Sequence, residues 1–450
     1  MLTRPANPFQ ASAAPLTLYD DTLRDGEQMA GLAFSPQQKL ELAQALAQAG
    51  VRLMQAGYPA ASPGEAAACA ALLRARRQGA LPAPLELALL ARPTPGDLEA
   101  CLQACRCAGV EPGSVSVVLL AAVSDLHLRH KLGPRLMAWR GLDAGHAGSV
   151  PISSLRRWAL DLALEGIDQA RRLGFGLVEC ALEDASRAEA AWVRVAAVAV
   201  QEAGARRITF CDTCGVLTPE QVRAQVPGLA AALGVARGRA ELAAHFHDDY
   251  GLAAANTIQA ALCGCTHLTV TLNGLGGRCG NAALHRVVVP LRDLYGVTVG
   301  GFDYARLRAL SRLAERASGE LVPVHEAVVG RGAFRHESGL HVAALLEQPS
   351  TYQALEPSSV GGQMEFSFGK HSGREGVAAA LGRGAAAGTV ARVTQRLKRQ
   401  AERRAAGLLR RGAVKALLDA RDRLDDGRCL GVAQVRALGE GAGDPARSVA

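Results

Sequence analysis

Two histidines separated by one residue, His245 and His247, lie at the end of a short apolar run and have the side chains best suited to hold a metal ion. Residues i and i+2 of a strand point to the same face, so both imidazoles can project toward one place. Two imidazoles and one carboxylate are a common ligand set for a divalent cation that keeps positions open for substrate. The pattern predicts such a site, and the alternative is a hydrogen-bonded pair of histidines without a metal.

The remaining ligands are expected after other apolar runs of the chain. Asp25 follows the first run and is the preferred carboxylate, and Asn281 follows the last run and could complete or support the site. The glycine-rich segment 274–280 either cradles a phosphate or makes a tight turn that lets Asn281 approach the metal. These ligand types suit Mg, Mn, Zn or Fe and do not identify the ion.

Two charged residues near these positions could act on a substrate. Arg24 adjoins Asp25, and its guanidinium could stabilise an oxyanion that forms on a metal-bound carbonyl. The alternative for Arg24 is a structural ion pair with Asp21 or Glu27. Glu183 follows another apolar run and is either a proton-transfer group or part of an ion pair.

The elements that must position these residues are short apolar runs alternating with helical segments rich in Ala and Leu, such as 36–49 and 219–233. Alternation of this kind predicts a parallel sheet, and eight repeats predict a closed (β/α)8 TIM barrel, an α/β fold. Active sites of this fold lie at the carboxyl ends of the strands, where the polar residues above stand. The eight runs are residues 16–19, 51–56, 85–91, 115–121, 176–182, 207–211, 242–246 and 267–272.

The repeat of strands and helices stops near residue 299, which divides the chain into three predicted parts. Residues 16–297 form the barrel, 298–383 a loop-rich linker subdomain, and 384–450 a C-terminal helical region. The linker carries His336 to His341 and a polar glycine-containing segment at 369–374, which are either binding loops or ordinary surface turns. Segment 141–154, rich in Gly, Ala and Ser, is predicted to be an inserted surface loop.

The composition narrows the class of protein. The net charge of +8 comes mostly from arginines spread along the chain, and the cluster at 396–411 has helical spacing, so no nucleic-acid partner is expected. The 11 cysteines lack zinc-finger spacing and a secreted scaffold, which predicts reduced thiols in a cytoplasmic protein. No uncharged apolar run reaches the roughly 18 residues that a membrane helix needs, so no membrane partner is expected.

At these residues the sequence resembles the DRE-TIM metallolyase family, in the branch that carries out Claisen condensations. The matching segments occur in the family's order from residue 16 to about residue 380. They are DDTLRDGEQ (20–28), ECALEDASR (179–187), CDTCGVLTP (211–219), HFHDDYGLAAANT (245–257), NGLGGRCGNAAL (273–284), RHESGLHVAALL (335–346) and GKHSGR (369–374).

The resemblance implies a role for each matching position. It implies a homodimer with exchanged domains, in which His341 of one subunit is catalytic in the site of its partner. The implied metal ligands are Asp25, His245, His247 and Asn281; the implied catalytic residues are Arg24, Glu183 and His341; and the implied substrate contacts are Gln28, His127 and Thr213.

The resemblance also implies acetyl-CoA and a 2-oxo acid as substrates. Segments 123–133 and 182–189, and the lack of a further regulatory domain, resemble the homocitrate synthases of nitrogen fixation. These would join acetyl-CoA to 2-oxoglutarate, giving free CoA and homocitrate, the organic ligand of the nitrogenase metal cofactor. The alternatives are synthases for 2-oxoisovalerate or pyruvate, a cleaving relative, and a non-catalytic barrel. Gln55 and His285 replace residues that are glutamates in the family and would suit the last alternative.

Overall fold

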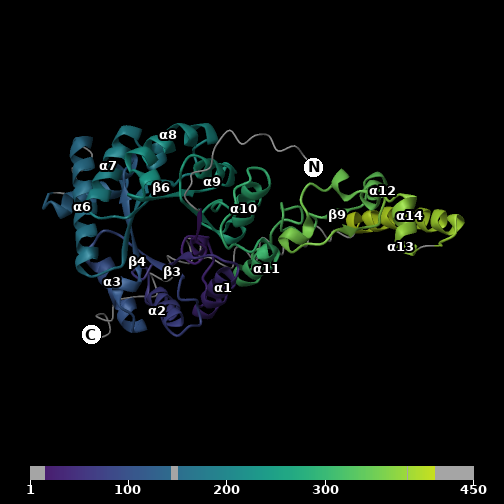
Figure 1. Cartoon of the computed structure of the whole chain (residues 1–450), viewed down its shortest axis with the longest axis horizontal. Coiled ribbons are helices and arrows are strands. Elements are labelled where there is room, and N and C mark those ends of the chain that lie inside the picture. Colours follow the sequence, from purple (N-terminus) through teal and green to yellow (C-terminus); the bar gives the residue numbers. More distant parts are fainter. Residues whose placement is uncertain (1–15, 143–149, 383, 411–450) are drawn as a thin grey trace, which may run out of the picture. The chain divides into compact units, whose positions relative to one another are not determined.

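The computed structural model describes residues 16–142, 150–382 and 384–410, which form two compact units (Figure 1). Of the described residues, the first unit contains 16–29, 33–142, 150–323 and 327–329, and the second contains 30–32, 324–326, 330–382 and 384–410. Each unit is considered by itself below. The division of the chain into three predicted parts stays a prediction.

The first unit is a closed barrel of eight parallel strands paired in chain order, which confirms the predicted fold class. Each predicted apolar run overlaps one strand, and β1 closes the ring by pairing with β8 from Thr17–His267 to Asp20–Val270. The strands are β1 (Thr17–Asp20), β2 (Leu53–Gly57), β3 (Glu86–Ala91), β4 (Ser116–Ala122), β5 (Leu177–Glu183), β6 (Arg207–Asp212), β7 (Glu241–Phe246) and β8 (His267–Val270).

Helices surround the strands, as Figure 1 shows. Several begin with a proline behind a serine or threonine whose side chain accepts a backbone N–H, as Ser35 does for α1 and Thr218 for α8. The helices that cover the barrel are α1 (Pro36–Gln48), α2 (Pro63–Arg77), α3 (Pro95–Ala108), α6 (Ile152–Arg172), α7 (Ala190–Glu202), α8 (Pro219–Ala232), α9 (Ala253–Leu262), α10 (Leu284–Asp293) and α11 (Leu307–Ser318).

The connection from β4 to α6 contains additional helical structure. It consists of α4 (Asp125–His127), one π-helical turn (Leu128–Leu132) and α5 (Gly133–Trp139). Part of the predicted surface loop 141–154 is helical, because α6 begins at Ile152, and residues 143–149 lie outside the described part of the chain. This connection places His127 and Lys131 beside the end of β5.

A buried ionic network fills the interior of the barrel on the side away from the carboxyl ends of the strands. Arg207, 1% exposed, contacts Glu86, Glu179 and Glu241, which come from three other strands. Glu179 also accepts hydrogen bonds from Tyr19 (3.0 Å) and Thr209 (2.5 Å). A buried charge is costly unless it is paired, and here the guanidinium of Arg207 pairs with the surrounding carboxylates.

Within its described residues the second unit contains a two-stranded parallel sheet and three α-helices, besides short 3-10 turns. The strands are β9 (Arg335–His336) and β10 (Glu365–Phe366), and the helices are α12 (Gly339–Glu347), α13 (Arg374–Leu381) and α14 (Ala387–Arg410). Both polar motifs of the linker lie here, and they meet where the Gly339 N–H donates to the His371 carbonyl oxygen. None of the helices in the described part of the chain is long and apolar enough to span a membrane.

Candidate active site

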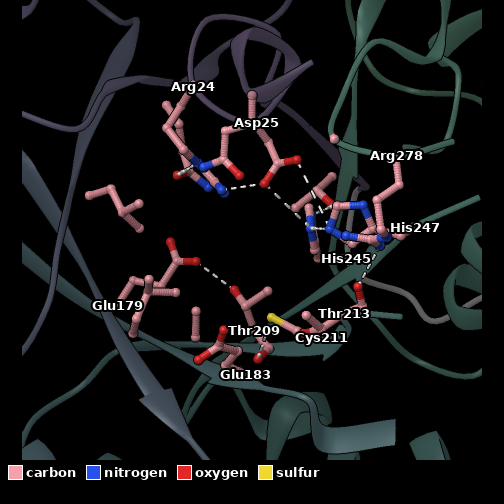
Figure 2. A pocket seen from close by; sticks show the side chains of 17 residues that line it. Arg24, Asp25, Glu179, Glu183, Thr209, Cys211, Thr213, His245, His247 and Arg278 are labelled. Atoms are coloured by element: carbon pink, nitrogen blue, oxygen red, sulfur yellow. Dashed lines mark hydrogen bonds and ion pairs between the residues drawn. The ribbon is translucent and has the colours of Figure 1, made fainter. Parts of the chain in front are cut away.

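Three predicted ligands come together at the carboxyl ends of β1 and β7. One ligand atom from each of Asp25, His245 and His247 lies within 4.8 Å of the other two, and all three residues are buried. Asp25 Oδ2 is 3.9 Å from His245 Nε2, and its Oδ1 is 4.0 Å from His247 Nε2. Figure 2 shows the Asp25 carboxylate pointing toward the two imidazole rings.

Hydrogen bonds fix which nitrogen of each imidazole carries its proton. His247 Nδ1 lies 3.2 Å from the carbonyl oxygen of Gly280, which can only accept, so Nδ1 is the donor. His245 Nδ1 lies 3.0 Å from Thr269 Oγ1, whose own proton goes to the Ala244 carbonyl. His245 Nδ1 is therefore a donor too, and both Nε2 atoms present lone pairs.

These two lone pairs face each other at a distance of 3.2 Å. Burial and the neighbouring His247 lower the pKa of His245 to about 3, and burial also lowers the pKa of His247, so a shared proton is disfavoured near neutral pH. A divalent cation with nitrogen ligands at about 2.0–2.1 Å satisfies two such atoms at this separation. The donor set therefore fits a divalent metal.

The carboxylate of the trio is held in its ionised form. Burial raises the pKa of Asp25, but the Arg24 guanidinium and the two imidazoles outweigh burial and hold it below its usual range. Asn281 Nδ2 donates to Asp25 Oδ1 at 2.9 Å and to the Leu275 carbonyl at 3.0 Å. In this orientation Asn281 supports the carboxylate, and direct binding of the metal by Asn281 stays a prediction.

The glycine-rich segment before Asn281 forms a tight turn. A Cβ atom at Gly276 would lie 2.2 Å from Asn281 Nδ2, and one at Gly280 would lie 1.9 Å from the Gly274 carbonyl oxygen. Gly280, at φ +88°, also supplies the carbonyl that orients His247. The turn therefore brings Asn281 and the acceptor for His247 to the site together.

Arg24 makes the ion pair considered above and also faces the site. Its Nη2 is 2.5 Å from Asp21 Oδ2, Nη1 donates to Asp25, and Nε donates to Gln55 Oε1 at 2.8 Å. Glu27, the other possible partner, pairs with Lys39 instead. Gln55 also donates to Asp21 at 3.2 Å, so Asp21 and Gln55 together hold the guanidinium. The pair with Asp21 was among the alternatives predicted for Arg24, whereas the sequence did not indicate the role of Gln55.

A cavity of about 270 Å³ opens between these residues and the ends of the other strands. Gln28, Thr213 and Glu183 line it, together with the trio and Arg24. The lining also includes the side chains of Leu90, Leu120, Ala181 and Cys211, together with the polar side chains of Thr209, Thr269 and Glu179. Figure 2 shows Glu179 and Glu183 on the side of the cavity opposite Arg24 and Asp25.

Glu183 is held at the rim by two cationic or basic groups. Lys131 donates a hydrogen bond to Glu183 Oε1, and His127 Nδ1 lies 3.7 Å from the same oxygen. Burial raises the pKa of Glu183, but the nearby His127 and the hydrogen bond from Lys131 outweigh burial and lower it. His127 is not among the residues that line the cavity, and its Nε2 lies 3.6 Å from Asp184 Oδ2.

Two further residues of the cavity were not expected from the sequence. Glu179 is a fully buried carboxyl group, and burial raises its pKa. Arg278 contacts Asp249 with two nitrogens at 2.8 Å and the Thr213 carbonyl at 2.7 Å. Glu179 lies two residues before Ala181 and four before Glu183, so all three occupy one face of β5. That spacing was a usable signal for Glu179.

His341, the remaining predicted residue, belongs to the second unit. It lies on α12, and its ring stacks on that of Tyr352 with 4.0 Å between the centroids. The predicted catalytic role of His341 and its supply by a partner subunit stay predictions. The cysteines in the described part of the chain are all free, in agreement with the expected reduced thiols.

Two family models match the chain. The HMGL-like model matches residues 15–142 and 146–314, and the model named homocitrate synthase post-HMGL domain-like matches residues 328–405. Together these matches cover the barrel and most of the chain that follows it.

Proteins with related sequences bear three different names. A homocitrate synthase of Methanopyrus kandleri is 37% identical over 81% of each chain, and one of Frankia alni is 37% identical over 82% of this chain and 94% of its own. A protein of Ignicoccus hospitalis named probable 2-isopropylmalate synthase is 36% identical over 81% of each chain. A putative citramalate synthase of M. kandleri is 37% identical over 82% of this chain and 65% of its own.

Solved structures with the same fold include two lyases. The hydroxymethylglutaryl-CoA lyase of Bacillus subtilis has a TM-score of 0.53 at 18% identity and covers 70% of this chain and 97% of its own. The corresponding lyase of Pseudomonas aeruginosa has a TM-score of 0.52 at 23% identity, over 74% of this chain and 98% of its own. At these identities the likeness supports the barrel fold alone.

Proposed function

Since the chain belongs to the HMGL-like family, in its α-isopropylmalate synthase group, we propose that it condenses acetyl-CoA with a 2-oxo acid and releases CoA. The new bond joins the methyl carbon of the acetyl group to the keto carbon of the acid. Water then hydrolyses the thioester, so the products are a hydroxy-dicarboxylic or hydroxy-tricarboxylic acid and free CoA.

The observation that carries this proposal is the convergence of two lone-pair nitrogens and one carboxylate in a cavity that Arg24 also lines. Asp25, His245 and His247 would hold a divalent metal. When bound, the metal would act as a Lewis acid that polarises a keto group and neutralises its developing charge. The open side of the trio faces the cavity where the 2-oxo acid would bind.

Arg24 would stabilise the negative charge that develops on the keto oxygen during attack. Its guanidinium is fixed by Asp21, Gln55 and Asp25, so it is oriented before substrate binds and loses little side-chain entropy. A preorganised donor of this kind lowers the barrier of the step in which charge appears.

Proton transfer from the acetyl methyl group is assigned to Glu183 with His341. Glu183 is ionised at neutral pH because its pKa is lowered, and it lines the cavity on the side away from Arg24. We propose that His341 reaches the site from a partner subunit in a homodimer, as the family resemblance implies. Gln28 and Thr213, which line the cavity, would contact the substrate.

For the 2-oxo acid we propose 2-oxoglutarate, which would make the chain a homocitrate synthase. Support comes from the name of the second family model, from two relatives of that name, and from a second guanidinium in the cavity, that of Arg278, which suits a dianion. Homocitrate made here would serve as the organic ligand of the nitrogenase cofactor.

One observation favours a second candidate, a synthase for pyruvate or 2-oxoisovalerate. The lining of the cavity includes the apolar side chains of Leu90, Leu120 and Ala181, and the nearby Glu179 would repel an anionic tail. Relatives named for these activities are as similar to the chain as those named homocitrate synthase.

The deciding experiment measures CoA release from acetyl-CoA with 2-oxoglutarate, pyruvate and 2-oxoisovalerate at equal concentrations. The proposal expects the highest kcat/KM with 2-oxoglutarate. A preference for either monoacid would transfer the assignment to the second candidate. Release with none of the three, from protein loaded with Mg²⁺, Mn²⁺ or Zn²⁺, would contradict the condensation and favour a non-catalytic barrel.

A further inference from the structure

The imidazole of His127 stands between two carboxylates at the end of β5. Its Nδ1 lies 3.7 Å from Glu183 Oε1, and its Nε2 lies 3.6 Å from Asp184 Oδ2. Its Nε2 also lies 3.4 Å from Nη2 of Arg187. Only the last separation is short enough for a hydrogen bond, so the contact with Arg187 decides which ring nitrogen carries the proton.

The contact with Arg187 requires one tautomer of His127. A guanidinium has only N–H groups and can only donate, so His127 Nε2 is the acceptor and Nδ1 carries the proton. The other tautomer would turn an Nε2–H group toward Asp184, whose Oδ2 already accepts from Ser124 and Arg187. His127 is therefore neutral, and its N–H group is on the nitrogen nearer to Glu183.

Arg187 is itself held by a buried carboxylate. Its Nε donates to Asp184 Oδ1 at 2.7 Å, and its Nη2 donates to Asp184 Oδ2 at 2.8 Å. Asp184 is fully buried and lies in the left-handed region at φ +61°, which an aspartate tolerates. Ser124 after β4 donates to this carboxylate, and the Asp184 N–H donates to Thr213 Oγ1 after β6 at 2.9 Å. These contacts join three strand ends and fix the guanidinium relative to His127.

The Nδ1 atom of His127 still needs an acceptor. It is buried and has no hydrogen-bond partner among the described residues. Leaving a buried N–H group without an acceptor is costly, and Glu183 Oε1 lies just beyond hydrogen-bond range at 3.7 Å. Hydrogen bonds of catalytic groups are often long without substrate and shorten in the complex.

We propose that His127 and Arg187 are positioning residues for Glu183: Arg187 keeps the proton of His127 on Nδ1, and this N–H donates to Glu183 Oε1 during the reaction. The inference rests on the proposed proton transfer by Glu183. Lys131 and His127 would then both hold Oε1, which leaves Oε2 to take the proton from the substrate. His127 thus acts through the carboxylate, in place of the substrate contact that the family resemblance implies.

Two amide substitutions separate the roles of the two ring nitrogens. The amide nitrogen of His127→Asn can replace Nδ1, whereas that of His127→Gln can replace only Nε2. We expect kcat to fall about 10-fold in His127→Gln, which loses the donor to Glu183, and at most about threefold in His127→Asn. The KM for the 2-oxo acid should stay within about twofold in both, because His127 does not bind the substrate.

The pH profile gives a readout that a general loss of structure would not move. A donor at the Nδ1 position favours ionised Glu183, so the acidic limb of kcat/KM should move to higher pH in His127→Gln and less in His127→Asn. Both variants keep the other titratable or charged groups that surround Glu183, which are Lys131 from the π-helical turn, Asp184 and Arg187 from the segment after β5, and Cys211 from β6.

Nitrogen-15 NMR of histidine-labelled protein measures the tautomer without turnover. The signals that His127→Asn lacks belong to His127, and in the wild type they should show the proton on Nδ1. Arg187→Met should move the proton to Nε2 and lower kcat as His127→Gln does. Arg172→Met, which breaks an exposed ion pair with Asp168 on α6, is the matched control and should change neither.

Equal values of kcat in His127→Asn and His127→Gln, with normal circular dichroism, would overturn the inference. A rise in the KM for the 2-oxo acid in both variants would also overturn it and assign His127 to the substrate. If the wild type released no CoA in any assay, the condensation would fail, and the NMR spectra would still decide whether Arg187 sets the tautomer of His127.

Discussion

Lys131 donates a hydrogen bond to Glu183 Oε1, and this contact helps to keep ionised a carboxylate that lines the active-site cavity. The other groups around Glu183 are His127, the Asp184–Arg187 ion pair and the buried thiol of Cys211. Of these neighbours, Lys131 and His127 lower the pKa of Glu183.

Lys131→Met should therefore shift the pH dependence of catalysis. Removing the ammonium raises the pKa of Glu183, since burial then has less opposition. If ionised Glu183 is the active form, activity falls as the pH drops through this pKa, so the acidic limb of kcat/KM should move to higher pH. Lys131→Arg keeps the charge and should leave the limb in place. An acidic limb that is the same in Lys131→Met as in the wild type would exclude this role.

Removal of the metal should stop the reaction and reduce stability. We expect the purified protein to hold about one divalent ion per chain by elemental analysis, and a chelator to abolish CoA release. A ligand present at 100 times its Kd stabilises the folded state by about 2.7 kcal/mol, so adding the ion back should raise Tm measurably.

His247→Ala is the companion variant for that experiment. It removes one of the two facing lone pairs and should lose both the bound ion and the rise in Tm. His130→Ala, an exposed histidine outside the trio, is the control and should behave as the wild type. Full activity of the metal-free wild type would contradict the assignment of the trio.

Local patterns in the sequence were sufficient to predict the barrel and the convergence of Asp25, His245 and His247. Each of the eight apolar runs overlaps a strand, and the spacing of His245 and His247 predicted that both rings project to the same place at the end of β7. Asp25 could be chosen because the carboxyl ends of all strands meet at the same end of a barrel. These inferences need only local periodicity and the known closure of the fold.

The contacts that hold the site depend on register and closure, which local patterns do not contain. Arg24 meets Gln55 across 31 residues, and Tyr19 meets Glu179 across 160. The helical connection after β4 was also missed, and it is this segment that brings Lys131 to Glu183. Such partners can be assigned only once neighbouring strands are aligned.

Arg24→Lys should reduce turnover with little loss of stability. Lysine keeps the positive charge beside Asp21 and Asp25 but cannot reproduce the three-partner geometry of the guanidinium. We expect kcat to fall by about 100-fold, as for the loss of one preorganised oxyanion donor, with Tm within a few degrees of the wild type. A kcat within about threefold of the wild type would show that Arg24 is structural.

Gln55→Ala tests whether the orientation of Arg24 matters by itself. It removes the acceptor for Arg24 Nε without touching the charge, so we expect a smaller fall in kcat, about 10-fold, with normal metal content. Loss of the metal in this variant would instead mean that Gln55 supports the trio through Asp21.

Arg207→Met should destabilise the barrel because it leaves carboxylates buried without their cation. Arg207 is 1% exposed and contacts Glu86, Glu179 and Glu241. Breaking a buried ionic network by removing one partner costs about 3–5 kcal/mol, which urea unfolding would measure. Glu179→Gln in the same chain removes one of the stranded charges and should recover part of the loss. A decrease in the free energy of unfolding below about 1 kcal/mol in the single variant would show that water reaches these carboxylates, although the residues are buried in the structure.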